Sequence, residues 1–135
     1  MNEEEALARV ASARVARMAT VDRRGAPHVV PVVFALEGRT LYWAVDTKPK
    51  RRREVRRLDN LRANPAVQLV VDHYDEDWAR LWWVRLTGRG RVLGSGEESA
   101  RALAMLSEKY GQYRRDAPPG PVMAIDVQSV SSWEP

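Results

Sequence analysis

The chain has 135 residues, of which 44% are hydrophobic, and we expect a single domain over residues 1–135 with one core. It contains no cysteine, which excludes disulfide bonds, thiolate nucleophiles and cysteine-ligated metal centres. It has no run of about 18 or more apolar residues, and its acidic N-terminus does not resemble a secretory signal. We therefore expect a cytoplasmic protein with no membrane partner.

The formal net charge is +4, and the positive charge is concentrated in one segment. Between Lys48 and Arg62, eight lysine or arginine residues stand against Glu54 and Asp59, a balance of +6, so the rest of the chain sums to −2. One basic segment on a near-neutral body indicates a local site for phosphate or carboxylate groups. A solvated helix with exposed charges explains the charge run alone about equally well.

The first half of the chain predicts one short helix followed by three strands. The helix is expected at residues 3–12 and the strands at 14–21, 27–36 and 40–46. Turn residues at 22–25 and 37–39 separate the strands. Strands joined by such short turns predict a meander, in which each strand pairs with the next.

Two further helices are expected in the second half. Apolar residues recur at helical spacing within the basic segment, and Asn64-Pro65 predicts where that helix ends. The pattern Ser95-x-x-Glu98 predicts a capping box that opens the other helix.

Three more strands, at residues 66–74, 81–93 and 122–127, bring the expected number to six. The glycine-rich residues 88–94 miss the dinucleotide-binding fingerprint by one position and lie inside a strand pattern, so a β-bulge is expected there. Six strands with short peripheral helices predict a mainly β fold, a small antiparallel barrel.

The basic segment does not present one uniform surface on a helical wheel. Arg51 and Arg62 project near its buried side, and Arg57 flanks that side. Three arginines point away from it, namely Arg52, Arg53 and Arg56. Lys48, Lys50 and Arg51 lie at the N-terminal end, where free backbone N–H groups and the helix dipole also favour an anion.

The tryptophans gather on other segments. Trp43 lies on the third predicted strand, and Trp78, Trp82 and Trp83 surround the turn before the fifth. Trp82 and Trp83 point to opposite faces if they share a strand, so one of them is expected to meet a ligand or another subunit. Packing of Trp43 and one of the pair in the core is equally compatible with the sequence.

The chain lacks the usual motifs for metal or hydrolytic chemistry. His28 and His73 are two isolated histidines, and the acidic residues 72–77 do not have the spacing of a calcium loop, so no metal site is expected. There is no nucleophile elbow, phosphate-binding P-loop or zinc-protease motif.

Four segments follow one another in a characteristic order: PHVVPVVF, TLYWAVDTKPK, RRLDNLRANPAVQLVVDHYDEDW and LWWVRLTGRGRV. In this order they resemble the pyridoxamine 5'-phosphate oxidase-like split-barrel superfamily, and within it the small deazaflavin-dependent oxidoreductases that use coenzyme F-420. The similarity extends from about Val15 to Trp133. It implies a homodimer of antiparallel six-stranded split β-barrels (the FMN-binding split barrel), with a cofactor groove at the subunit interface.

The resemblance also implies roles for individual residues. The strand that lines the flavin-type ring corresponds to residues 28–34, which include Pro31, Val32 and Val33. The strand beside the ribityl chain and phosphate corresponds to Trp43, Ala44 and Val45. The phosphate-binding residues correspond to Lys48, Lys50, Arg51 and Arg57. Trp78 resembles the segment that reaches across the dimer.

The leading hypothesis is an oxidoreductase in which reduced F-420 transfers a hydride to an electron-poor small molecule. The cofactor carries that chemistry, and no side chain is assigned as catalytic. An FMN-dependent reductase or oxidase of the same fold is one alternative, and a protein that binds or sequesters the cofactor without turnover is another. Nucleic-acid binding through Arg52, Arg53 and Arg56 is disfavoured, because the rest of the chain is net acidic.

Overall fold

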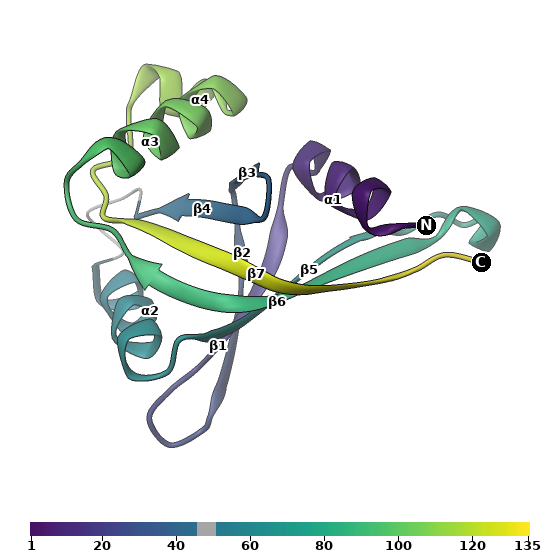
Figure 1. The fold of residues 1–135 in the computed structure, drawn as a ribbon, viewed down its shortest axis with the longest axis horizontal. Helices are drawn as coiled ribbons and strands as arrows, with labels where there is room; N and C mark the ends of the chain where they lie inside the picture. Colours follow the sequence, from purple (N-terminus) through teal and green to yellow (C-terminus); the bar gives the residue numbers. More distant parts are fainter. Residues whose placement is uncertain (46–50) are drawn as a thin grey trace.

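A computed structural model of the chain describes residues 1–45 and 51–135, with side chains described for all of these except 51–55. Within these residues, seven strands form one antiparallel sheet in the order β2-β1-β5-β6-β7-β4-β3 (Figure 1). The strands are β1 (Ala16–Val21), β2 (Pro27–Val32), β3 (Ala35–Glu37), β4 (Thr40–Ala44), β5 (Ala66–His73), β6 (Trp82–Val92) and β7 (Val122–Trp133). The helices are α1 (Glu3–Ser12), α2 (Arg51–Ala63), the short 3-10 helix η1 (Trp78–Arg80), α3 (Glu97–Lys109) and α4 (Gly111–Arg115). No helix in the described ranges is long and apolar enough to cross a bilayer.

The mainly β, antiparallel fold predicted from the sequence is confirmed, but two details are wrong. The strand expected at residues 27–36 is divided into β2 and β3, so the described residues form seven strands instead of six. The meander is wrong only as a continuous strand order: the predicted neighbours do pair, β1 with β2 and β3 with β4, but the two pairs lie at opposite edges of the sheet. The free sides of β1 and β4 are taken by β5 and β7, which come later in the chain.

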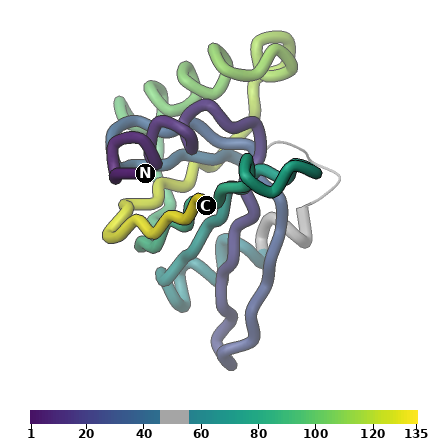
Figure 2. The backbone as a smooth tube through the Cα atoms, turned by 90° about the vertical axis from the view of Figure 1, so that its right-hand side faces the viewer, coloured from purple at the N-terminus to yellow at the C-terminus, as the bar shows by residue number. Residues whose placement is uncertain are grey.

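The two edge strands, β2 and β3, are joined by a short stretch of chain and not by hydrogen bonds to each other. Only Val33 and Phe34 connect the end of β2 to the start of β3. Three Cα steps of about 3.8 Å span at most roughly 11 Å, so the two edges must come together at this point. The sheet is therefore strongly curled (Figure 2), and the junction at Val33 and Phe34, which we call the split, is where the barrel stays open.

The Tyr110 side chain provides hydrogen-bond partners for the backbone at the split. Phe34 is fully buried, and its N–H donates to the Tyr110 hydroxyl oxygen at 3.1 Å. The same hydroxyl lies 3.0 Å from the carbonyl oxygens of Phe34 and Arg14, either of which can accept its proton. Because an unpaired buried backbone group is costly, Tyr110 supplies what a neighbouring strand would supply elsewhere in the sheet.

Apolar side chains are buried on both faces of the curled sheet. Adjacent residues of β4 illustrate the alternation, since Trp43 packs in the barrel interior with Met18 and Leu86, whereas Tyr42 faces α3 and packs with Leu106. Helices α3 and α4 cover this second face near β4 and β3 (Figure 1). Both faces of β4 are therefore fixed by packing.

The predicted capping box at Ser95 and Glu98 is not formed. Gly96 is the N-cap of α3, with a φ of 156°, and no side chain caps the helix. Glu98 instead receives two hydrogen bonds of 2.8 Å from Arg91 and one of 2.8 Å from the Tyr42 hydroxyl. The bidentate contact with Arg91 lowers the pKa of Glu98 to about 2. This carboxylate joins α3 to β6 and β4.

The predicted bulge is confirmed at the glycine-rich part of β6. The register of β6 against β7 shifts between Thr87 and Gly88, where a side chain would collide with the backbone carbonyl of Asp126. Two residues further on, a Cβ at Gly90 would lie 2.6 Å from Leu61 Cδ2. The absence of a side chain at Gly90 thus lets α2 lie directly on the sheet.

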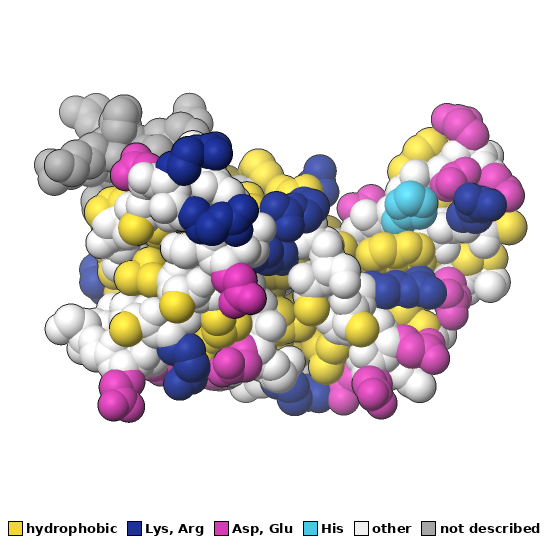
Figure 3. Space-filling model, turned by 90° about the horizontal axis from the view of Figure 1, so that it is seen from above, with side chains coloured by type: hydrophobic (Ala, Val, Ile, Leu, Met, Phe, Trp, Pro, Cys, Tyr) yellow, Lys and Arg dark blue, Asp and Glu magenta, His cyan; other side chains and the backbone are white. Residues whose placement is uncertain are grey.

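The turn between β5 and β6 projects from the body as an arm, which we define as residues 74–81. In the view from above, the arm stands apart from the body with a hollow between them (Figure 3). Tyr74 and Trp78 on the arm are among the most exposed large hydrophobic residues, and Trp78 is 68% exposed. Exposed aromatic rings on a projecting turn are a feature of binding surfaces.

We expect Tyr110→Phe to lower the free energy of unfolding by about 1–3 kcal/mol, because it leaves the buried N–H and carbonyl of Phe34 without a partner. Urea titration followed by circular dichroism measures this. The matched control is Tyr74→Phe, which removes the hydroxyl of an exposed tyrosine. Equal and small effects of the two substitutions would contradict the role given to Tyr110.

Candidate functional site

The basic helix α2 lies against the sheet with a defined inner face. Leu58 and Leu61 are buried, and so is Asn60, whose side-chain amide donates to the Thr20 hydroxyl at 3.5 Å. The sequence interpretation missed Asn60, since a polar residue in a strongly charged segment gives no sign of burial. The inward placement predicted for Arg62 is wrong, because its side chain is exposed and Asn60 completes the buried face instead.

Arg57 and Trp43 form the centre of the candidate site. The Arg57 guanidinium lies 5.8 Å from the centre of the Trp43 ring, a cation–π contact between α2 and β4. Arg57 is half-buried, as its predicted position beside the inner face requires, whereas Arg56 is exposed. The structure therefore confirms that neighbouring arginines of the basic segment have different surroundings.

The indole nitrogen of Trp43 has an unusual environment. The side chain is only 2% exposed, and its Nε1 is buried with no hydrogen-bond acceptor in the described part of the chain. A buried N–H donor without a partner is uncommon and costs roughly 1–3 kcal/mol. The donor and the Arg57 cation together create a local preference for an electron-rich group at the end of β4.

The other predicted site residues are only partly brought together. Val32 and Val45 pack in the same core cluster as Trp43, and Ala44 faces α3 in the second cluster. Pro31 is exposed and Val33 is half-buried at the split. Lys48 and Lys50 lie outside the described residues, and Arg51 is the first residue of α2, with its side chain not described.

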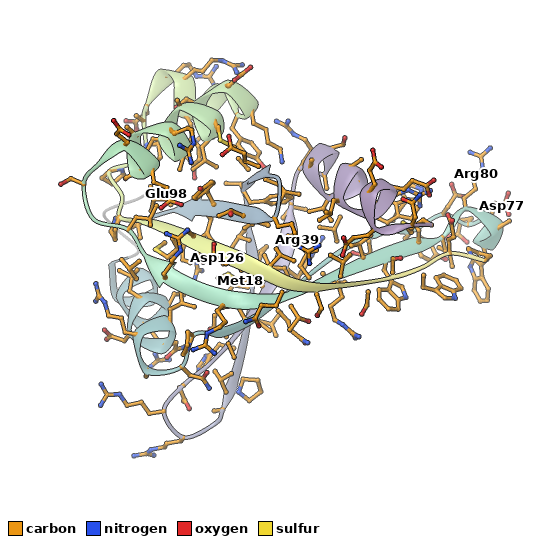
Figure 4. All side chains as sticks on the ribbon, viewed as in Figure 1. Met18, Arg39, Asp77, Arg80, Glu98 and Asp126 are labelled. Atoms are coloured by element: carbon orange, nitrogen blue, oxygen red, sulfur yellow. The ribbon has the colours of Figure 1, made fainter. Side chains whose placement is uncertain are left out.

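Trp78 is distant from this cluster within one chain. Asp77, the N-cap of η1, and Arg80, the last residue of η1, lie at the opposite end of the molecule from α2 (Figure 4). Trp82 and Trp83 at the base of the arm point to opposite faces, as predicted from their adjacency in a strand. Trp82 packs against the core and stacks with His73, whereas Trp83 lies beneath the Arg85 guanidinium at 5.5 Å.

The sequence interpretation also missed Lys109 at the end of α3. Its Nζ is buried 4.0 Å from the centre of the Phe34 ring and 5.3 Å from that of Tyr110, with no hydrogen-bond acceptor among the described residues. Burial, and secondarily the charge of Arg14, lowers the pKa of Lys109 to about 8. No local pattern marks this lysine, because its environment is made by Phe34, distant in sequence.

The curled sheet, opened at the split and carrying a basic helix beside its fourth strand, is that of a split β-barrel. A family model for pyridoxamine 5'-phosphate oxidase matches residues 3–134, nearly the whole chain. The chain belongs to the pyridoxamine 5'-phosphate oxidase family.

Solved structures show the same fold in proteins with varied descriptions. An FAD-binding protein from Mesorhizobium loti is 24% identical, with 98% of this chain and 94% of that chain covered and a TM-score of 0.71. A protein of unknown function from Corynebacterium diphtheriae is 25% identical, with 98% and 93% covered and a TM-score of 0.72. A heme storage protein from Vibrio cholerae is 16% identical, with 98% and 93% covered and a TM-score of 0.74. No protein with a curated description matches the sequence.

We expect Lys109→Met to raise the free energy of unfolding at pH 7 by on the order of 1 kcal/mol, a value that allows for the partial exposure of the lysine stem. The folded-state pKa is about 8, below the ordinary 10.5, so the unfolded chain binds more protons between these values. The free energy of unfolding of the native protein therefore increases as the pH rises from about 8 to 10.5. Over the same range, the extra stability of the Lys109→Met variant relative to the native protein decreases.

Thermal unfolding at several pH values measures this difference. The control is Glu108→Gln, an exposed neighbour on the same helix, which is expected to show no change over this window. An advantage of Lys109→Met that stays constant from pH 7 to pH 10.5 would mean that Lys109 ionises normally.

Proposed function

We propose that this protein is an oxidoreductase that binds the deazaflavin coenzyme F-420 and uses its reduced form to reduce an electron-poor small molecule. The observation that supports it best is the half-buried Arg57 guanidinium over the buried Trp43, whose indole N–H has no partner in the described part of the chain. The pair stands where the family resemblance expects the phosphate and ribityl chain.

The described residues fit a cofactor of this kind. A phosphate needs cations and N–H donors, and Arg57 and the start of the 13-residue helix α2 provide them beside Trp43. Lys48, Lys50 and Arg51 stay predicted phosphate ligands. Apolar side chains of Val32 and Val45 beside Trp43 provide a surface that keeps water from an aromatic ring.

The protein's part in the reaction is then to bind, orient and exclude water. The bound deazaflavin would supply the hydride, and no side chain is needed as a nucleophile. Pro31, Val32 and Val33 are proposed to border the ring, since they lead into the split where β2 ends. A rigid backbone there is suited to orienting a ring, because Tyr110 fixes the next residue, Phe34.

FMN is the second candidate for the cofactor. The similar structure from Mesorhizobium loti is described as an FAD-binding protein, which supports a flavin as the alternative cofactor. An FMN-dependent reductase or oxidase, or a protein that only binds or sequesters its cofactor, would use the same Arg57 and Trp43. The cytoplasmic location stays a prediction.

We further propose that the protein acts as a homodimer. The arm carries Trp78 away from α2 within one chain, so only a second copy can bring this tryptophan to the cofactor site (Figure 4). Val29 and Trp133 are further large hydrophobic side chains exposed on the sheet. Burial of such exposed apolar side chains against a second copy would lower the free energy of the dimer.

Titration of the purified protein with F-420 and, separately, with FMN tests the cofactor assignment by fluorescence. We expect F-420 to bind more tightly. Arg57→Gln should weaken F-420 binding by roughly tenfold to more than a hundredfold, the loss of a charged hydrogen bond of about 1.5–3 kcal/mol. The matched control is Arg56→Gln, an exposed neighbour. Strong FMN binding with no F-420 binding would overturn the deazaflavin assignment and leave the split barrel intact.

Sedimentation analysis at micromolar concentration is expected to show a dimer. Trp78→Ala should weaken both dimerisation and cofactor binding, whereas Arg80→Ala, on the same arm and 73% exposed, should leave both nearly unchanged. A monomer that binds the cofactor with full affinity would contradict the shared site.

A further inference from the structure

A groove lined by three arginines lies between the C-terminal end of α1 and the sheet. It has a volume of about 500 Å³, within the range of roughly 300–1,000 Å³ typical of small-molecule pockets. We call it the cationic groove, and its main lining residues are Arg9, Ala13, Arg14, Arg17, Val71 and Trp82. These residues come from α1, β1, β5, β6 and the α1–β1 connection, and none comes from α2. Figure 1 shows α1 and α2 as separate helices on the curled sheet.

The wall of the groove is apolar and aromatic. Trp82 packs against the core, and its ring is stacked with His73 at 6.2 Å and 18°. The Arg9 guanidinium lies 5.1 Å from the centre of the same ring. Ala13 and Val71 add aliphatic surface. The groove therefore has an apolar wall against which the planar, apolar part of a ligand can pack.

The positive charge of the groove is incompletely balanced. Arg9 shares Glu134 with the N-terminal amino group, at 3.2 and 2.9 Å, and Arg17 stands 3.9 Å from Asp72, a carboxylate that also lines the groove. Arg14 has no carboxylate within 4.0 Å among the described residues. Its guanidinium is held by the Lys109 carbonyl at 3.1 Å and by the Tyr110 ring at 4.7 Å.

Arg14 is therefore an exposed cation, held by one hydrogen bond and one ring contact, that has no carboxylate partner among the described residues. A guanidinium with free N–H groups binds carboxylates in two-pronged fashion, and fixing it beforehand reduces the entropy lost on binding. The nearby Lys109 adds a second positive group and makes an anion still more favourable.

We propose that the cationic groove binds a small organic acid, with its carboxylate on Arg14 and its apolar, preferably aromatic body along Ala13, Val71 and Trp82. The charge selects the acid over its neutral analogues. The apolar wall selects an aromatic or aliphatic acid over a bare inorganic anion. None of its lining residues belongs to α2 or β4, although Arg17 on β1 pairs with Pro31, which we propose to border the cofactor ring.

Isothermal titration of the protein with 2-naphthoate tests the proposal, and 2-naphthamide serves as the uncharged probe of the same shape. We expect saturable binding of the acid and binding of the amide at least about tenfold weaker, the value of one charged hydrogen bond. Arg14→Gln should weaken the binding of the acid by a similar factor and leave the binding of the amide almost unchanged. Arg101→Gln, an exposed arginine on α3, is the matched control and should change neither.

Arg14→Gln also removes the bond to the Lys109 carbonyl, so Arg9→Gln provides a second variant whose expected effect is a smaller loss of affinity for the acid. The proposal is overturned if the acid and the amide bind equally, if the acid does not saturate at ~1 mM, or if Arg101→Gln weakens it as much as the groove variants do. Binding of the acid that is unaffected in both groove variants would place it elsewhere on the protein.

Discussion

The hydroxyl group of Tyr110 is the contact on which the arrangement of this barrel depends. A sheet with edges β2 and β3 joined at Val33 and Phe34 has to leave buried backbone groups without a strand partner. Tyr110 accepts from the Phe34 N–H and lies within bonding distance of its carbonyl. The tyrosine reaches this position from the end of α3, whose first turn is fixed by the ion pair of Glu98 with Arg91. The first turn of α3 is thus bonded to β6 and β4, and its C-terminal end is bonded to the split.

The charge distribution accounts for the two anion-binding sites that we propose on one small domain. The basic helix α2 lies on the sheet at Gly90 and holds Arg57 over Trp43, while Arg56, Asp59 and Arg62 are exposed to solvent. The second place is at Arg14, which the Lys109 carbonyl and the Tyr110 ring hold in a fixed orientation without a neighbouring carboxylate among the described residues. A net charge of +4 therefore understates the local attraction for acids.

The sequence was sufficient for features that depend on local patterns. The antiparallel β fold, the bulge at Gly88 and the opposite orientations of Trp82 and Trp83 follow from strand periodicity and glycine chemistry. Features set by distant contacts could not be predicted. The break in the strand at residues 27–36 depends on Tyr110, and Glu98 left its predicted capping role because Arg91 and Tyr42 are stronger partners.

The same distinction applies to the candidate site. Helical spacing correctly separated Arg57 from Arg56, since both belong to one regular helix. Burial of Asn60 and Lys109 could not be predicted, because their partners, Thr20 on β1 and Phe34 in the split, are far away in the chain. Lys48 and Lys50 lie outside the described residues, so their assignment rests on the family resemblance.

A crystal structure of the protein grown with F-420 would test the account most directly. We predict that the phosphate lies at the start of α2 within reach of Arg57, that the ring borders β2 next to the split, and that Trp78 of a second copy reaches the same site. A cofactor bound away from Arg57 and Trp43, or a protein that crystallises without F-420 although it is present at saturating concentration, would contradict the proposed function.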